Sequence, residues 1–464
     1  MNVAQNSLTN GNVSFWYDEI GFPVRQPPLA ESITADVCIV GAGYTGMWTA
    51  YYLKKAAPHL RIVILEKQFA GFGASGRNGG WLTNSVTGGR DQYVPSHGRE
   101  AATSMQLAMN DTVDEVIRVC EAEGINAEII KGGELNVAFN AAQHARLLEW
   151  AEDEHAWGFD EVIVRNAQET LDRICMPEVV SSIWHPHCAR IQPAKLAQGL
   201  RSLILELGVE LYEDTTVTEI RPHQALTRSG IVTADHVIRA TEGFTAALKG
   251  VHRQVLPMNS SIIVTNPLPD EMWEEIGWNG FETLGDMAHV YFYAQRTSDN
   301  RIAMGGRGVP YRYGSNTDNN GQAQQSTINT LAALTHKHFP QTKSVGFDHV
   351  WSGVLGVPRD WSAAVNYVSS TGEGSAGGYV GTGVTATNLA GRTLRDLILG
   401  QSTELTELPW VNHQVRNWEI EPLRWIATHG LYAAYGFADK QEERRSSAHT
   451  SVVASIANRI TGRH

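Results

Sequence analysis

Three glycines near the start of the chain have the spacing of a phosphate-binding turn. Gly41, Gly43 and Gly46 form the pattern GxGxxG directly after the apolar residues 37–40, which are typical of a buried parallel strand. In such a turn the first glycine permits a tight bend, the second lets the backbone approach a pyrophosphate, and the third lets the next helix pack closely on the strand. The free N–H groups at the start of that helix attract phosphate. This segment therefore predicts a dinucleotide site.

An acidic residue stands at the end of the next apolar strand. Residues 61–67 read RIVILEK, and Glu66 lies about 20 residues after the last glycine, where a carboxylate accepts hydrogen bonds from ribose hydroxyls. A lone GxGxxG is a frequent pattern. The order of strand, glycine turn, helix, strand and terminal acid is far more specific, so we interpret the segment as one βαβ unit.

Further glycine-rich segments favour FAD over NAD as the dinucleotide. Residues 71–81 read GFGASGRNGGW, and residues 377–400 repeat the order of strand, glycines and helix, with a helix expected to begin near Val384. The positive end of that helix would stabilise the negative charge of a reduced flavin. Residues 231–243 read IVTADHVIRATEG and predict a strand that ends in Ala240-Thr241-Glu242-Gly243, as at the sheet edge where dinucleotides lie. A cofactor that draws on such distant segments is more extended than NAD.

Eight segments, taken in order, resemble the FAD-dependent oxidoreductases of the D-amino-acid oxidase superfamily. They read ADVCIVGAGYTG, GASGRNGGW, GGELNVAF, ARIQPAKLAQGL, DHVIRATEG, DNRIAMGGRG, VWSG and GYVGTGVTATNLAG, and they cover roughly residues 30–400. The chain is most similar to the bacterial amine-oxidising branch, which includes γ-glutamylputrescine oxidases and aminophosphonate oxidoreductases. The resemblance implies an α/β fold in which a doubly wound, Rossmann-like parallel sheet domain binds FAD. A mostly antiparallel α+β substrate domain is interleaved with it.

The resemblance also implies domain boundaries and cofactor contacts. We expect the FAD-binding domain at 30–90, 188–248 and 350–400, the substrate domain at 91–187 and 249–349, and a helical C-terminal extension at 401–464. The residues expected to bind FAD are Gly41, Gly43, Tyr44, Thr45, Gly46, Glu66, Lys67, Gly73, Ala74, Ser75, Arg77, Asn78, Gly79, Gly80, Trp81, Val217, Ala240, Thr241, Gly353, Gly381, Thr382, Gly383, Val384 and Thr385.

The implied reaction is oxidation of a primary or secondary amine. Hydride leaves the carbon beside the amine nitrogen for the flavin, and water hydrolyses the resulting imine to an aldehyde or ketone and releases an amine or ammonia. Oxygen then reoxidises the flavin and gives hydrogen peroxide. The alternatives are a dehydrogenase that uses a quinone or carrier, a D-amino-acid or aminophosphonate oxidoreductase, and a flavin-bearing subunit of a larger complex.

The chain departs from the family pattern in three places. No arginine follows Trp351-Ser352-Gly353 at the place of a carboxylate clamp, which favours an amine without an α-carboxylate unless Arg307, Arg312 or Arg359 substitutes. No cysteine follows Cys188 and the second glycine segment has no histidine, so we expect non-covalent FAD. No lysine lies between Lys249 and Lys337, where relatives use one with oxygen, so the acceptor stays open.

Residues 288–308 predict a hairpin that lines the substrate site. Alternation places Tyr291 and Tyr293 on one face, where they could hold an ammonium group by cation–π attraction. His289 and Tyr293 are the candidates to accept a proton. Trp351 is placed either against the flavin or in the core, and the aromatic residues are equally compatible with ordinary packing in a sheet.

Composition narrows the remaining classes. The formal charge of −12 offers no basic surface for nucleic acid. The N-terminus lacks a secretory signal and no apolar run reaches about 18 residues, so we expect a cytoplasmic protein without a membrane span. His185-Pro186-His187-Cys188 lacks a second ligand pair, so no metal site is expected. Apolar residues of the tail, including Trp418 and Trp425, would cover either this chain or a second copy in a homo-oligomer.

Overall fold

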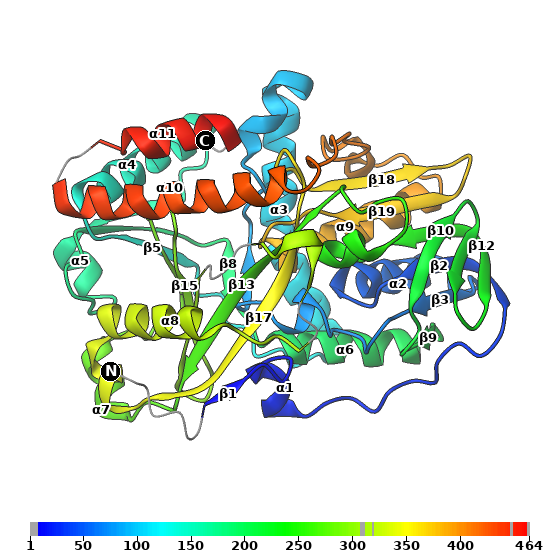
Figure 1. Ribbon diagram of the computed structural model, residues 1–464, viewed down its shortest axis with the longest axis horizontal. Coiled ribbons are helices and arrows are strands. Elements are labelled where there is room, and N and C mark those ends of the chain that lie inside the picture. Colours follow the sequence, from blue (N-terminus) through cyan, green and yellow to red (C-terminus); the bar gives the residue numbers. More distant parts are fainter. Residues whose placement is uncertain (1–7, 307–310, 318–319, 446–448, 462–464) are drawn as a thin grey trace.

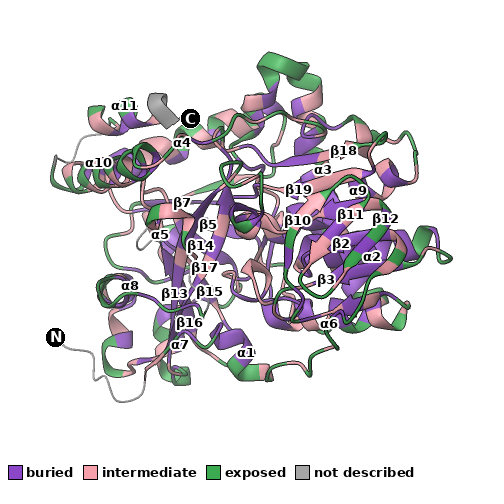
Figure 2. Cartoon of the chain, turned by 45° about the vertical axis from the view of Figure 1, so that its right-hand side comes forward, coloured by how far each residue is buried: buried purple, intermediate pink, exposed green. Residues whose placement is uncertain are grey.

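The computed structural model describes residues 8–306, 311–317, 320–445 and 449–461. Two large sheets dominate the molecule, one on each side of the view in Figure 1. The buried residues concentrate in these sheets and in the helices packed between and against them (Figure 2). The predicted fold class, an α/β protein with a doubly wound parallel sheet joined to a mostly antiparallel one, is confirmed.

The eight-stranded sheet has a parallel centre. Strands β12, β2, β3 and β9 are parallel neighbours, and β19 pairs in parallel with β12. The strands are β2 (Ile33–Val40), β3 (Ile62–Leu65), β9 (Glu210–Tyr212), β10 (Val217–Arg221), β11 (Gln224–Thr227), β12 (Ile231–Arg239), β18 (Ala364–Val368) and β19 (Glu373–Gly377). The whole of β3 and residues 37–40 of β2 are buried and apolar, as parallel strands covered on both faces require.

The nine-stranded sheet is mostly antiparallel. Only the pairs β1–β17 and β5–β14 run parallel within it. Its order is β1 (Thr9–Asn10), β17 (Phe347–Val357), β13 (Leu256–Thr265), β16 (Ile302–Gly306), β15 (Tyr293–Arg296), β14 (Thr283–Asp286), β5 (Glu134–Ala138), β7 (Ser181–His185) and β6 (Ile163–Asn166). A separate ribbon joins β4 (Trp81–Thr83) to β8 (Cys188–Arg190).

Eleven α-helices are assigned in the described residues, and their packing shows how the two sheets are joined. They are α1 (Phe15–Ile20), α2 (Tyr44–Ala56), α3 (Val94–Ala122), α4 (Ala141–Trp157), α5 (Ala167–Leu171), α6 (Pro193–Glu206), α7 (Asp270–Ile276), α8 (Gln325–His338), α9 (Gly383–Ile398), α10 (Leu423–Arg445) and α11 (Val452–Thr461). The apolar faces of α2, α3, α6 and α9 share one core with β2 and β3. Across the molecule, α10 and α11 lie over α4 (Figure 1).

Two predicted domain boundaries differ from the observed packing. Helix α3 was assigned to the substrate domain, but its buried Met109 and Val113 pack in one core with Ile39 of the parallel sheet. The apolar stripe of α3 in the sequence indicates that one face of the helix is covered, but it does not indicate which part of the chain covers it. The boundary at residue 350 falls inside β17, which pairs with β13 in the nine-stranded sheet up to Val357. Because β17 contains glycines, its sequence resembles that of a loop, although these residues form a strand.

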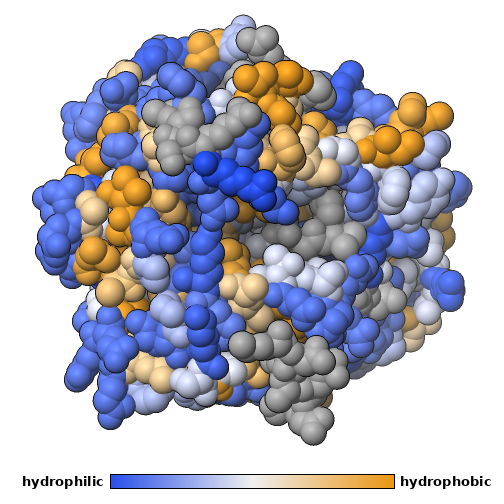
Figure 3. Space-filling view, turned by 60° about the vertical axis from the view of Figure 1, so that its left-hand side comes forward, coloured by the Kyte–Doolittle hydropathy of each residue, from blue (hydrophilic) through white to orange (hydrophobic). Residues whose placement is uncertain are grey.

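The C-terminal extension is helical, as predicted. Trp418 is buried against the rest of the chain, where its indole N–H donates a 2.7 Å hydrogen bond to the Val357 carbonyl. Leu423 and Ile426, at the start of α10, are each 57% exposed and do not cover this chain. Figure 3 shows apolar side chains on this side of the molecule as separate patches among hydrophilic ones. Within the part of the chain that the structure describes, no helix is long and apolar enough to cross a membrane.

Gly391 sets the close approach of α9 to α2, and its replacement tests this packing. A Cβ at Gly391 would lie 2.8 Å from the Cβ of Trp48, whereas one at Gly436 in α10 would meet nothing within 4 Å. We expect Gly391→Ala to lower the free energy of unfolding by about 1–3 kcal/mol because the helices must separate. Gly436→Ala should raise it by up to about 1 kcal/mol through helix propensity. Chemical denaturation measures both, and equal effects would contradict the packing argument.

Candidate functional site

A cavity of about 380 Å³, the first cavity, opens at the carboxyl ends of the parallel strands. Its walls come from the ends of β2, β3 and β12, the second glycine segment and the start of α9. Sixteen of the residues predicted to bind FAD line it: Gly41, Gly43, Tyr44, Thr45, Glu66, Lys67, Gly73, Ala74, Ser75, Asn78, Val217, Ala240, Thr241, Gly381, Gly383 and Val384. Segments more than 300 residues apart in sequence therefore meet at one place.

The first glycine turn has the geometry that its sequence predicts. Gly41 has φ +106°, and a Cβ there would lie 2.5 Å from the Ala240 carbonyl oxygen. A Cβ on Gly46 would lie 2.1 Å from the Gly41 carbonyl oxygen, which explains why Gly46 supports the turn without lining the cavity. A Cβ on Gly43 would meet only the Ser75 hydroxyl, at 3.1 Å. Gly43 thus presents bare backbone to the cavity at the N-terminus of α2.

Glu66 is fixed by backbone and keeps capacity for a ligand. Its two carboxylate oxygens accept hydrogen bonds from the backbone N–H groups of Ala42 (2.8 Å) and Gln68 (2.9 Å). Burial raises the pKa of this carboxyl, while the two N–H groups act in the opposite direction. A carboxylate has about four acceptor positions, so the remaining lone pairs can accept from ribose hydroxyls.

The second glycine segment is braced by its own side chains. The Asn78 amide donates to the carbonyl of Ser75 (2.9 Å) and accepts from the N–H of Gly80 (2.8 Å). Gly80 has φ +74°, and a Cβ there would lie 2.4 Å from the Ile191 carbonyl oxygen. Gly80 therefore shapes the segment and, like Gly46, lines neither this cavity nor the second one described below.

The start of α9 is suited to a flat, electron-accepting ring. Gly381 has φ +112°, and a Cβ there would meet nothing within 4 Å, because it would project into open cavity space. The first N–H groups of α9, which begins at Gly383, lack carbonyl partners within the helix. The buried Thr385 hydroxyl has no hydrogen-bond partner among the described residues. These features fit a cofactor that accepts hydrogen bonds and negative charge.

Glu242 is a buried acid of the first cavity that the sequence analysis missed. Its carboxylate accepts hydrogen bonds from the N–H groups of Gly378 (2.8 Å) and Gly356 (3.1 Å), and so ties three segments together. Burial raises its pKa to about 7, against the lowering effect of these N–H groups. The signal was present, because Glu242 follows a strand that ends at the carboxyl edge of the sheet.

A second cavity of about 340 Å³ adjoins the first. Ala74, Asn78, Gly381, Val384 and Leu355 line both. The second cavity also takes in further predicted residues: Arg77, Gly79, Trp81, Tyr291, Tyr293, Gly353 and Thr382. A ligand that fills the first cavity would therefore expose one end to the second.

The ring of Tyr293 occupies a slot beside Gly79 and Gly305. Cβ atoms on Gly79 and Gly305 would lie 2.7 Å and 2.1 Å from its ring, so both positions need glycine. Its hydroxyl lies 2.8 Å from the Ser260 hydroxyl. The predicted hairpin is present as β15 and β16, but β15 begins only at Tyr293, and Phe292 is also part of the cavity wall.

Two acidic residues that the sequence analysis missed line the second cavity. Burial alone would raise the pKa of Glu134, but hydrogen bonds from His185, Asn136 and Thr83 outweigh it and lower the pKa. Asp286 accepts a hydrogen bond from the N–H of Phe292 (3.0 Å), and desolvation raises its pKa to about 7. The second cavity thus contains one carboxyl group that stays charged, Glu134, and one whose pKa lies at about 7, Asp286.

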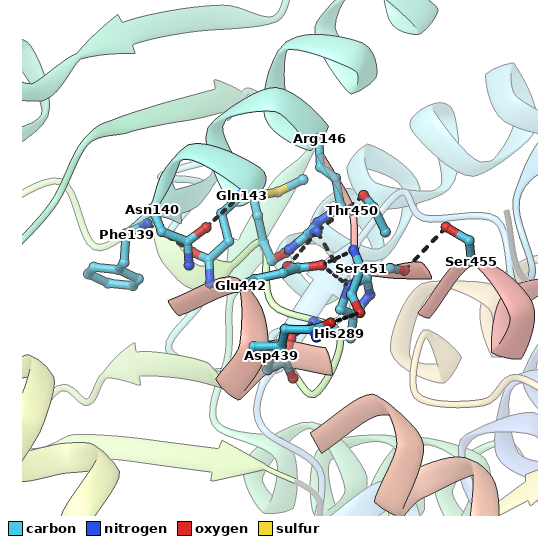
Figure 4. A network of polar contacts seen from close by, with 12 residues as sticks. Phe139, Asn140, Gln143, Arg146, His289, Asp439, Glu442, Thr450, Ser451 and Ser455 are labelled. Carbon is cyan, nitrogen blue, oxygen red and sulfur yellow. Dashed lines mark hydrogen bonds and ion pairs between the residues drawn. The ribbon is translucent and has the colours of Figure 1, made fainter. Parts of the chain in front are cut away.

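The structure does not bring His289 to either cavity. Its Nε2 lies 3.0 Å from a carboxylate oxygen of Glu442 in α10, and its backbone N–H donates to Asp439 (2.9 Å). Arg146 completes the cluster with a 2.9 Å contact to Glu442 (Figure 4). His289 therefore attaches the C-terminal extension to α4, and the prediction of a proton acceptor at this position is wrong. The region before β15 is a turn, so alternation does not apply there.

Trp351 is a core residue and not part of a cavity wall. It is fully buried among Phe15, Trp16 and His349, and its indole N–H donates to the Arg77 carbonyl at 2.8 Å. It therefore supports the second glycine segment from behind.

Of the three arginines offered as carboxylate clamps, the two that the structure describes line neither cavity. Arg359 pairs with Glu419 at 3.1 Å. Arg312 is described but lines neither cavity, and Arg307 lies outside the described residues. Arg77 lines the second cavity, but it donates to the carbonyls of Phe72 and Ser352.

Comparisons with known proteins agree with this geometry. Residues 36–397 match the family of FAD dependent oxidoreductases known as DAO. The gamma-glutamylputrescine oxidoreductase of Escherichia coli is 30% identical over 81% of this chain and 86% of that protein. A probable oxidoreductase, OrdL, of Haemophilus influenzae is 26% identical over 85% of this chain and 89% of that protein. The crystal structure of glycine oxidase from Geobacillus kaustophilus has a TM-score of 0.68 and 20% identity, and covers 82% of this chain and 99% of that one.

The chain therefore belongs to the DAO family of FAD-dependent oxidoreductases. The predicted cofactor, FAD, and the predicted branch are confirmed by this membership and by the relatives found. Which residues contact FAD stays a prediction, and the first cavity gathers most of the candidates.

Replacement of Gly43 tests whether the first cavity holds the cofactor. We expect Gly43→Val to yield folded protein with at least tenfold less bound FAD, because its side chain would occupy the space that the phosphates need. Gly430→Val is the matched control, since a Cβ at this exposed position in α10 meets nothing within 4 Å. Flavin absorbance per chain is the measurement. A normal FAD content in Gly43→Val would contradict the assignment.

Proposed function

We propose that the protein oxidises a primary or secondary amine to an imine, which water hydrolyses to an aldehyde or ketone. The observation that carries the proposal is the second cavity, whose wall contains Glu134 and Asp286 together with Tyr291 and Tyr293, beside the predicted cofactor segments. Carboxylates and aromatic faces both bind ammonium groups. The name of the Escherichia coli relative, which acts on an amine derivative, supports the same class.

FAD would be held by the first cavity, and the protein supplies its orientation. Its phosphates would lie at the N-terminus of α2, its ribose at Glu66 and its ring near Gly381. When bound, FAD supplies the two-electron acceptor for the substrate. None of the four cysteines lines either cavity in the described part of the chain, which supports the expectation that FAD is bound without a covalent bond.

The residues of the second cavity would bind the amine and manage its proton. An amine enters as an ammonium ion, which Glu134 attracts with its fixed negative charge. Hydride loss requires the neutral amine, so a group in the cavity must first accept a proton. Asp286 is suited to this step, because its pKa of about 7 lets it hold the proton at neutral pH. It replaces His289 as the candidate.

The lining disfavours α-amino acids as substrates. Arg77 is the only arginine of the second cavity in the described residues, and it donates to backbone carbonyls. An α-carboxylate would instead meet Glu134 and Asp286, which repel it. This supports an amine without an α-carboxylate.

Reoxidation of the reduced flavin requires an electron acceptor. We propose oxygen, with hydrogen peroxide as the product, and a quinone or carrier as the alternative. No lysine lines the second cavity among the described residues, and this observation favours the alternative. A cytoplasmic location stays a prediction.

Anaerobic mixing with amines tests the proposed reaction. We expect alkylamines and diamines to bleach the oxidised flavin spectrum, and glycine or D-alanine to bleach it at least tenfold more slowly. Subsequent addition of oxygen should restore the spectrum with one equivalent of peroxide if oxygen is the acceptor. Bleaching by amino acids alone would contradict the proposal, and slow recovery in oxygen with fast recovery in a quinone would select the dehydrogenase.

The pH dependence of flavin reduction tests the role of Asp286. Only ionised Asp286 accepts a proton, so the rate should rise as pH increases through about 7. Asp286→Asn should remove this rise of the rate with pH and slow flavin reduction by about 10²–10⁴-fold. Glu242→Gln is the control, because burial also places the pKa of Glu242 at about 7. If only the control lost the rise of the rate with pH, this pH dependence would belong to Glu242 and not to Asp286.

A further inference from the structure

A third cavity of about 350 Å³ shares two wall residues with the second cavity. Ser85 and Trp150 line both, so the two spaces meet at this wall. The third cavity is bounded by the end of α4, by residues 89–91 and by the segment around His185 and His187. No step of the proposed amine oxidation uses it.

The lining of the third cavity is strongly acidic. It contains four carboxylates, Asp91, Asp153, Glu154 and Glu161, and one guanidinium, that of Arg90. The Arg90 guanidinium lies 2.8 Å from the Asp153 carboxylate and 3.1 Å from the Glu154 carboxylate, so its positive charge is already paired with these two residues. A cationic ligand would offset the remaining negative charge, whereas an anion would add to it.

The buried imidazole of His185 offers an acceptor to this cavity. Its Nε2 lies 3.5 Å from the Glu134 carboxylate of the second cavity, and its Nδ1 has no hydrogen-bond partner among the described residues. The residue is only 6% exposed. A neutral imidazole that donates from Nε2 has a lone pair on Nδ1 and accepts there. The Nδ1 of His187, whose Nε2 contacts Glu161, is also without a partner in the described structure.

We propose that the third cavity binds a second ammonium group of the substrate, which makes the substrate class diamines and longer polyamines. This inference rests on the proposed function and specifies its substrate. The reacting amine would lie at Glu134 and Asp286, the alkyl chain would pass Ser85 and the indole of Trp150, and the distal ammonium would donate to imidazole nitrogens and carboxylates of the third cavity. An ammonium group has three donors, which suits this set of acceptors.

Matched pairs of amines test the proposal. Putrescine and butylamine have the same carbon chain, as do cadaverine and pentylamine, but only the diamines have a distal ammonium. The dependence of the anaerobic flavin-reduction rate on amine concentration gives a Kd for each. We expect each diamine to bind at least tenfold more tightly than its monoamine partner. Equal Kd values within a pair would overturn the distal site, while no reduction by any amine would contradict the proposed function itself.

Two variants on one helix locate the effect. Glu154→Gln keeps the shape of a third-cavity residue and removes its charge, so it should narrow the Kd ratio between butylamine and putrescine by at least threefold. Glu152→Gln is the control, since Glu152 is exposed on the same helix and lines none of the three cavities. An unchanged ratio in Glu154→Gln, or an equal change in both variants, would overturn the proposal.

A steric variant keeps the test independent of Arg90, which Glu154 also contacts. Ser85→Leu places bulk at the wall between the two cavities and should weaken putrescine and spermidine more than butylamine. Flavin absorbance per chain and thermal unfolding confirm that each variant is folded. Equal weakening of all three amines would show that the chain does not pass this wall, and would overturn the proposed path.

Discussion

The structure depends on close backbone contacts at the carboxyl edge of the parallel sheet. Gly41 approaches Ala240, Gly46 approaches Gly41, and Gly391 brings α9 against α2, each at a distance that excludes a side chain. These contacts place the N-termini of α2 and α9 at one cavity, although the two helices begin more than 300 residues apart. Because helix N-termini carry partial positive charge, the same contacts that close the core also gather positive charge at this cavity, which suits phosphates and a reduced flavin.

The carboxyl groups that line the first and second cavities lie in different local environments. Glu66 is held by backbone N–H groups, Glu134 is held in its charged form by His185, Asn136 and Thr83, and desolvation brings Asp286 to a pKa of about 7. Their different surroundings suit these carboxyl groups to the different roles that we propose: ribose binding, cation binding and proton transfer. The formal charge of −12 agrees with the proposed cationic substrate, and the carboxylates of the second cavity are the local support for it.

Local sequence patterns predicted which segments meet at the first cavity. The glycine turns, Glu66 and the start of α9 near Val384 each depend on contacts with near neighbours or on the ends of single strands, which a pattern can express. The substrate half depends on contacts between distant segments. Glu442 and Asp439 of α10 take His289 away from the cavity, and Asp286 reaches it through the pairing of β14 with β5. Neither effect leaves a periodic signal in the sequence.

The most direct test of the account is a crystal structure of the protein with FAD, reduced and soaked with putrescine. The account predicts the pyrophosphate at Gly43, the flavin ring beside Gly381 and one ammonium group within hydrogen-bond distance of Glu134 or Asp286. A flavin outside the first cavity, or a diamine bound away from these two carboxylates, would contradict it.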